Sequence, residues 1–90
     1  MKKFEPDWTI PPGAHLEEWR EENCMPLPML QRKLNLRADQ LNDILRGRVV
    51  LDEHMMLRLE SITSIPAQFW RKAQATYIAD LERGAKPSID

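Results

Sequence analysis

The stretch Leu27–Leu45, LPMLQRKLNLRADQLNDIL, decides how this chain of 90 residues folds. Proline is tolerated in a helix only within its first turn, where the backbone N–H groups have no partner, so Pro26 and Pro28 predict a helix that begins near Leu27. Its apolar positions lie four residues apart, at Leu30 and Leu34. Asn35 can adopt the left-handed conformation that ends a helix, which predicts a short helix that stops at this residue.

A second helix is expected after the turn Asn35-Leu36-Arg37, in which Leu36 fills the space between the two helices. Apolar residues then recur three or four positions apart, at Ala38, Leu41, Ile44 and Leu45. The run stops at Gly47, and glycine is common just past the end of a helix. The remaining positions are polar, namely Asp39, Gln40, Asn42 and Asp43, so one side of this helix is expected to face solvent.

The flanking sequence predicts three more helices. A helix over residues 14–23 has on one side Leu16, Trp19 and Asn23. Asp52 is a good N-cap for a fourth helix, whose apolar positions are Met55, Met56, Leu59 and Ile62. Ser64 is expected to cap a fifth helix that has Pro66 in its first turn and runs to Gly84, with apolar positions at Phe69, Trp70, Ala73, Tyr77 and Leu81.

These elements predict an all-α fold of five helices in a single domain. Residues 1–12 contain two proline sites and no helical period, so they are expected to form an extended N-terminal arm whose Trp8 and Ile10 pack onto the body. The domain itself is expected to span residues 13–83. Residues 84–90 are polar and predict a flexible tail.

Composition narrows the class of protein. Ninety residues are too few for a multidomain enzyme, and 42% hydrophobic residues suffice for a modest core. Cys24 is the only cysteine, which excludes an internal disulfide. Neither a signal peptide nor a run of about 18 apolar residues is found, so a cytoplasmic protein without a membrane span is expected.

The sequence contains no motif for catalysis. No Ser-His-Asp or Cys-His spacing and no glycine-rich phosphate loop stands out. His15 and His54 lie far apart, and no third ligand has metal-binding spacing. We therefore expect no enzyme activity, no metal and no cofactor.

The two helices of the deciding stretch have the spacing of a helix-turn-helix, in which the second helix enters the major groove of DNA. Residues 31–48 contain five basic and two acidic residues, a net charge of +3, whereas the rest of the chain sums to −4. A local basic strip is the electrostatic signature of a DNA-binding surface, because each neutralised phosphate releases counterions.

The chain also resembles a known family, the lambda-repressor-like helix-turn-helix antitoxins of the HigA/VapI type, over roughly residues 4–83. The similarity lies in the arm Phe4-Glu5-Pro6-Asp7-Trp8 leading to Pro12-Gly13, the core from Leu30 to Gly47, and the ending Ile65-Pro66-Ala67-Gln68-Phe69-Trp70 with Tyr77. The resemblance implies a homodimeric repressor that binds a palindromic operator. It also makes a small RNase-type toxin a candidate partner, which the protein would neutralise.

The family's base-reading positions fall on Ala38, Asp39, Gln40 and Asp43. Arg37 is placed to contact a guanine edge or a phosphate, Gln40 and Asn42 can pair with adenine, and a carboxylate can accept from cytosine N4. Arg46 and Arg48 fall where the family contacts phosphate, and Arg32 and Lys33 extend the basic strip. The predicted DNA-binding residues are thus Arg32, Lys33, Arg37, Ala38, Asp39, Gln40, Asn42, Asp43, Arg46 and Arg48.

A homodimer is expected because a single short recognition helix makes too little contact for operator selectivity. Its interface is predicted on the last helix and the loop before it, with Phe69, Trp70, Tyr77 or Ile78 as candidates. An alternative stays open, since Pro26 and Leu27 stand where the family has a polar capping residue followed by glutamine, a pair that reaches phosphate. Two of the base-reading positions, Asp39 and Asp43, are acidic and would be repelled by phosphate. In that alternative the DNA-binding surface is lost, and the protein is an interaction module with an antitoxin-like fold that sequesters a protein partner.

Overall fold

Five helices and two short strands make up the computed structural model, which describes residues 8–87. In chain order they are β1 (Trp8–Thr9), α1 (Pro12–Glu22), α2 (Leu27–Leu34), α3 (Ala38–Leu45), α4 (Glu53–Thr63), α5 (Ala67–Glu82) and β2 (Lys86–Pro87). The predicted all-α class is confirmed. Residues 1–7 and 88–90, including the arm positions Phe4 and Pro6, lie outside the described residues. Within residues 8–87, no helix has the length and hydropathy of a membrane span.

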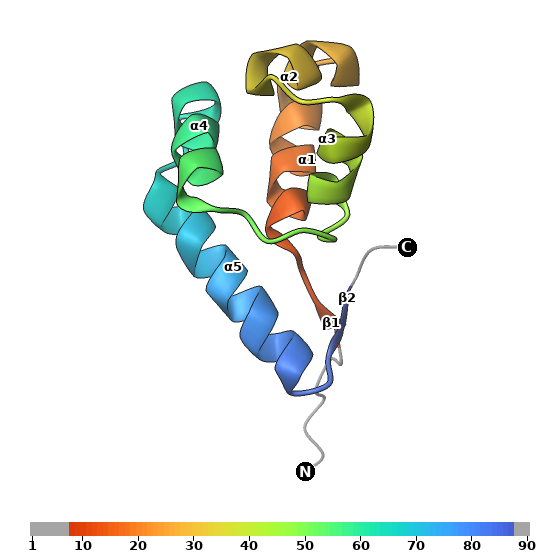
Figure 1. The fold of residues 1–90 in the computed structure, drawn as a ribbon, viewed down its shortest axis with the longest axis vertical. Coiled ribbons are helices and arrows are strands. Elements are labelled where there is room, and N and C mark those ends of the chain that lie inside the picture. The colour runs from red at the N-terminus through yellow and green to blue at the C-terminus, as the bar shows by residue number, and fades with distance from the viewer. Residues whose placement is uncertain (1–7, 88–90) are drawn as a thin grey trace.

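The helices form two packed groups (Figure 1). α1 and α3 lie side by side, and α2 lies across their upper ends. α4 packs against the first half of α5, and the rest of α5 extends below the other helices toward β1 and β2. The molecule is accordingly elongated, about 47 Å long and 23 by 22 Å across.

The core forms where the two groups meet. Leu30 and Leu34 of α2 pack with Leu41 and Ile44 of α3, as their spacing predicts. The same cluster includes Leu16, Leu51, Met56, Leu59, Ala67 and Trp70. Leu36 is partly buried against this cluster, which places the turn between α2 and α3 directly on the core.

A glycine allows α1 and α3 to approach closely. α1 begins at Pro12, two residues before the predicted start, and Gly13 is buried at its second position. A Cβ on Gly13 would lie 1.9 Å from the carbonyl oxygen of Ile44 and 2.6 Å from the Cα of Leu45. Only a residue without a side chain fits there, so Gly13 sets the distance between α1 and the end of α3.

Single residues define the ends of α2 and α4 and the start of α4. Asn35 ends α2 in the left-handed conformation (φ 57°, ψ 48°), as predicted. Asp52 caps α4, since its Oδ1 accepts a hydrogen bond of 2.8 Å from the Met55 N–H. The expectation for Ser64 is wrong: Ser64 ends α4 with φ 65°, and Pro66 is the N-cap of α5 rather than part of its first turn.

The two ends of the described chain meet in a small parallel sheet, where Trp8 pairs with Lys86 and Thr9 with Pro87. Two expectations are corrected here. Trp8 and Ile10 are 60% and 51% exposed, whereas the neighbouring Thr9 is buried and its Oγ1 donates to Asp80 Oδ2 at 2.8 Å. In the predicted flexible tail, Lys86 and Pro87 are paired with β1.

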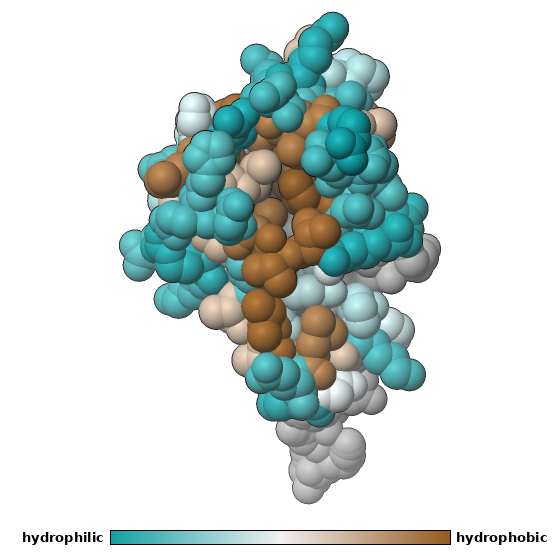
Figure 2. All heavy atoms as spheres, viewed as in Figure 1, coloured by the Kyte–Doolittle hydropathy of each residue, from teal (hydrophilic) through white to brown (hydrophobic). Residues whose placement is uncertain are grey.

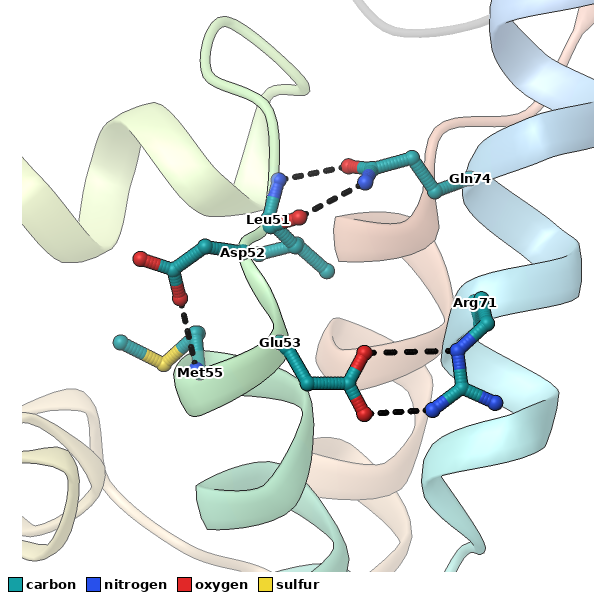
Figure 3. A network of polar contacts seen from close by, with 6 residues as sticks. All are labelled: Leu51, Asp52, Glu53, Met55, Arg71 and Gln74. Atoms are coloured by element: carbon teal, nitrogen blue, oxygen red, sulfur yellow. Dashed lines mark hydrogen bonds and ion pairs between the residues drawn. The ribbon is translucent and has the colours of Figure 1, made fainter.

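The segment 46–52 joins α3 to α4 and is bound to α5 (Figure 3). The buried Gln74 side chain accepts from the Leu51 N–H at 2.6 Å and donates to the Leu51 carbonyl at 2.8 Å. Next to it, Glu53 of α4 pairs with Arg71 of α5. Figure 2, which views the molecule from the same side as Figure 1, shows apolar side chains gathered in a band down the middle of that face. Within segment 46–52, the exposed apolar residues are Val49 and Val50.

Candidate nucleic-acid interface

The two sides of α3 differ in burial as its sequence pattern predicts. Leu41 and Ile44 are 2% and 6% exposed and face the core. Asp39, Gln40 and Asn42 are exposed and Asp43 is half-buried, so the polar side reaches solvent. Ala38 is exposed as well, whereas the spacing of the apolar residues had placed it on the buried side of the helix.

The amide of Gln40 is used to cap α3. The Arg37 N–H donates to Gln40 Oε1 at 2.8 Å, which satisfies a backbone group at the start of the helix. Pairing with adenine in the usual bidentate manner needs both the oxygen and the nitrogen of the amide. Gln40 Oε1 would therefore have to accept from both the Arg37 N–H and adenine if it reads adenine in this way.

Arg37 and Asp39 form a bidentate ion pair at the same helix end. The Nε of Arg37 lies 3.1 Å from Oδ1 of Asp39, and Nη2 lies 3.3 Å from Oδ2. Both side chains point into solvent, with exposed fractions of 72% and 69%. The hydrogen bond from Arg37 lowers the pKa of Asp39, and the same contact raises the pKa of Arg37.

Two further basic residues lie just beyond the C-terminal end of α3. Arg46 Nε donates to Asn42 Oδ1 at 3.4 Å, and Arg48 Nη1 lies 3.7 Å from Asp43 Oδ1. Each acidic residue of α3 therefore has an arginine beside it, and the local surplus of positive charge remains. Neutralising the carboxylates in this way reduces the repulsion that they would exert on a phosphate backbone.

The surface of α2 next to α3 is of mixed character. Arg32 and Lys33 are exposed in the last turn of α2, as predicted. Its first turn is apolar, with Leu27 and Met29 43% and 41% exposed. A hollow of about 70 Å³ lies between α2 and α3 at the surface and is lined by Leu27, Gln31, Ala38, Leu41, Asn42 and Leu45.

The predicted dimer residues do not form one face. Trp70 is completely buried and Tyr77 is 7% exposed, so both belong to the core of this chain and their assignment to a dimer interface is corrected. Phe69 and Ile78 are exposed, at 38% and 37%. Nine helical positions correspond to about two and a half turns, so these two side chains lie on opposite sides of α5.

An open groove of about 420 Å³ adjoins Phe69. It lies between β1 and α5, and its apolar lining includes Trp8, Ile10 and Ala73. The ring of His15 meets that of Phe69 edge to face, with 5.1 Å between the ring centres. This is an exposed apolar patch of the kind that often marks a contact with another protein.

Two residues that hold the α2–α3 region in place have no role in the sequence-based prediction. They are Gln74, which binds Leu51, and Arg58, whose Nη1 donates to the Leu34 carbonyl at 3.1 Å and so ties the end of α2 to α4. Gly13 belongs to the Pro12-Gly13 motif, but its close approach to α3 was not predicted. Gln74 carries a detectable signal, because it is a polar residue in line with Trp70 and Tyr77 on the buried side of α5. Nothing in the local sequence marks Arg58.

Among residues 8–87, no three His, Cys, Asp or Glu side chains are grouped so that they could hold a metal ion. Comparison of the chain with models of known protein families and with curated protein sequences finds no match.

Proposed function

We propose that this protein is a sequence-specific DNA-binding regulator in which α2, the turn Asn35–Arg37 and α3 act as a helix-turn-helix. The single observation that carries the proposal is the two-sided character of α3: Leu41 and Ile44 are buried, and the opposite polar side is exposed beside basic residues. A helix of this kind presents its N-terminal residues to base edges when it enters the major groove. The lambda-repressor-like fold is part of the proposal.

The basic residues are assigned to positioning on the DNA backbone. Arg32 and Lys33 lie in the last turn of α2, and Arg46 and Arg48 follow α3, so the four lie at the C-terminal ends of the two helices. Contacts of these side chains to phosphate add affinity that does not depend on sequence. Base recognition is assigned to α3 and Arg37, while Gln40 contributes through its Nε2 group without breaking the helix cap.

Two copies of the chain are proposed to bind a palindromic operator in the cytoplasm. Phe69 is the better of the two exposed candidates for the dimer contact, because it adjoins Trp8 and Ile10 in one apolar groove. Half-sites about one helical turn apart, roughly 34 Å, are expected on the DNA. Neutralisation of a small RNase-type toxin, which the family resemblance implies, is a further part of the proposal.

Selection from a pool of random duplexes at low salt tests the proposal. The full chain is expected to retain DNA, sequencing is expected to reveal a palindrome, and two chains should be bound per duplex. Arg46→Ala combined with Arg48→Ala is expected to weaken binding to all sequences and to reduce the slope of log K against log salt by about 2. Fluorescence anisotropy at several salt concentrations measures both quantities.

A matched control removes the same amount of charge elsewhere. Arg83→Ala combined with Lys86→Ala takes two exposed basic residues from the end of α5 and from β2. This variant is expected to bind like the wild type. Equal weakening in both double variants would mean that net charge alone governs the affinity, and an unchanged affinity in the variant of Arg46 and Arg48 would refute the docking.

A second candidate function is a protein-interaction module that sequesters a partner. The exposed Leu27 and Met29 favour it, because the first turn of α2 then lacks the polar groups that would anchor a phosphate. Failure of the full chain to retain any duplex at low salt would support this candidate against the regulator.

A further inference from the structure

We infer that Asp39 is a positioning residue for base recognition: it holds the Arg37 guanidinium so that the outer end of the guanidinium reads a guanine. The inference rests on the proposed DNA-binding function and goes beyond it, because it names one base and the residue pair that selects it. It also gives a second role to a carboxylate that repels phosphate and can itself read a base only by accepting from cytosine N4.

The geometry of the pair leaves the reading edge of Arg37 accessible. Asp39 accepts from Nε and Nη2, at 3.1 and 3.3 Å, and so occupies one side of the planar guanidinium. The guanidinium has five N–H donors in a fixed fork, and those at its end, on Nη1 and the outer side of Nη2, point away from the carboxylate. Guanine offers O6 and N7 in the major groove, which match two parallel donors of this kind.

The backbone of Arg37 is fixed as well. Its N–H donates to Gln40 Oε1 at 2.8 Å, and its φ and ψ of −80° and 163° place it at the N-cap of α3. Both the start of the side chain and its guanidinium are therefore held by the first turn of the same helix. In a helix-turn-helix this end of the second helix is the part that contacts base edges.

Holding the side chain matters because Arg37 is otherwise mobile. An arginine that is 72% exposed samples many rotamers, and ordering it on binding costs conformational entropy. A partner that limits those rotamers before binding reduces this cost and favours the base that fits the held orientation. The pairing also keeps the carboxylate ionised, since the pKa of Asp39 is lowered by Arg37.

Removing the Asp39 carboxylate distinguishes its charge effect on the affinity for DNA from its effect on the preference for guanine. If Asp39 acts only as a negative charge near phosphate, Asp39→Ala raises affinity for every sequence and leaves base preference unchanged. If Asp39 positions Arg37, the same substitution raises affinity for random DNA but lowers discrimination for guanine at one operator position. If Asp39 only stabilised α3, the substitution would not raise the affinity for random DNA and at the same time lower the preference for guanine.

The experiment compares full-length wild type, Asp39→Ala and Arg37→Ala by selection on random duplexes, followed by competition with duplexes that differ only at the position in question. The wild type is expected to require guanine there, and Arg37→Ala is expected to lose this preference. Asp39→Ala is expected to reduce the preference for guanine about tenfold, the lower part of the range for one bidentate contact. Asp39→Asn keeps a carbonyl oxygen that can accept from one N–H, so its preference for guanine should lie between those of the wild type and Asp39→Ala.

Glu53→Ala is the matched control, because it removes an exposed carboxylate that is also paired with an arginine, Arg71, but lies outside α2 and α3. It should leave the preference for guanine unchanged. Unaltered guanine preference in Asp39→Ala overturns the inference, as does loss of a cytosine preference, which would mean that Asp39 reads a base itself. If the wild type retains no duplex, the proposed function fails first, and the inference falls with it.

Discussion

At the scale of single residues, Gly13 occupies a position where no side chain fits. Its missing side chain lets the start of α1 touch the end of α3, and α3 is the helix to which base recognition is assigned. The neighbouring groups are backbone atoms of Ile44 and Leu45, which cannot rotate away as the end of a side chain would. Any larger residue at position 13 must therefore move one of the two helices.

Gly13→Ala is expected to lower the free energy of unfolding by about 3 kcal/mol, the upper end for overpacking, because the new methyl group would lie 1.9 Å from the Ile44 carbonyl oxygen. Urea unfolding followed by circular dichroism measures the change. Gly84→Ala is the control: at φ 98° with no atom within 4 Å of the new Cβ, it bears only backbone strain of about 1 kcal/mol. Equal losses in the two variants would contradict the close approach of α1 and α3.

At the scale of elements, the connection from α3 to α4 depends on one side chain of α5. Gln74 satisfies both the N–H and the carbonyl of Leu51, which is 5% exposed. About one turn earlier on α5, Arg71 pairs with Glu53 at the start of α4 (Figure 3). A buried backbone group without a partner is costly, so this contact fixes where segment 46–52 crosses the molecule. Arg46 and Arg48 lie on this segment, and their placement therefore depends on α5.

Gln74→Met keeps the length of the side chain and removes both hydrogen bonds. The expected loss of stability is about 3 kcal/mol, because two buried backbone groups of Leu51 lose their partner. Urea unfolding measures the loss, and hydrogen exchange is expected to become faster at the Leu51 amide. Gln68→Met, an exposed change on the same helix, should have little effect, and an unchanged Leu51 exchange rate in Gln74→Met would contradict the role of Gln74.

At the scale of the whole molecule, the two ends of the described chain are held together by β1–β2 pairing and by one polar contact. Thr9 lies 71 residues from Asp80, and its hydroxyl donates to the Asp80 carboxylate at 2.8 Å. Arg83 forms an ion pair with the same carboxylate. The Thr9 hydrogen bond first, and then Arg83, lower the pKa of Asp80.

Stability is expected to depend on pH through this carboxylate. Because the pKa of Asp80 is lower in the folded state, its contribution is fully present above the unfolded value of about 3.9 and is lost as pH falls through the folded pKa. The stability difference between wild type and Asp80→Asn should therefore be largest near neutral pH and shrink in acid. Denaturant unfolding from pH 7 down to about pH 2.5 measures it.

Glu82→Gln removes one exposed negative charge from the same helix and is the matched control for the pH series. A difference between wild type and Asp80→Asn that stays constant across the series would mean that Asp80 is not held in its ionised form by Thr9 and Arg83.

The sequence by itself determined the features that depend on neighbouring residues. The start of α2 near Leu27, its left-handed end at Asn35, the start of α3 at Ala38 and the Asp52 cap all follow from prolines, caps and helical spacing, which act within a few residues. The polar side of α3 was predictable for the same reason.

Only the tertiary structure decided the features that join distant segments. In the sequence, Trp70 is one of several apolar residues at helical spacing, and this pattern suits a dimer interface as well as a core. Its complete burial depends on the packing of α5 against the other helices. The need for glycine at position 13, the bonds from Gln74 to Leu51 and the pairing of Trp8 with Lys86 likewise depend on partners 23 or more residues away. Periodicity and capping describe how each helix is built, whereas the crossing points between helices depend on the shape of the whole core, which local sequence does not specify.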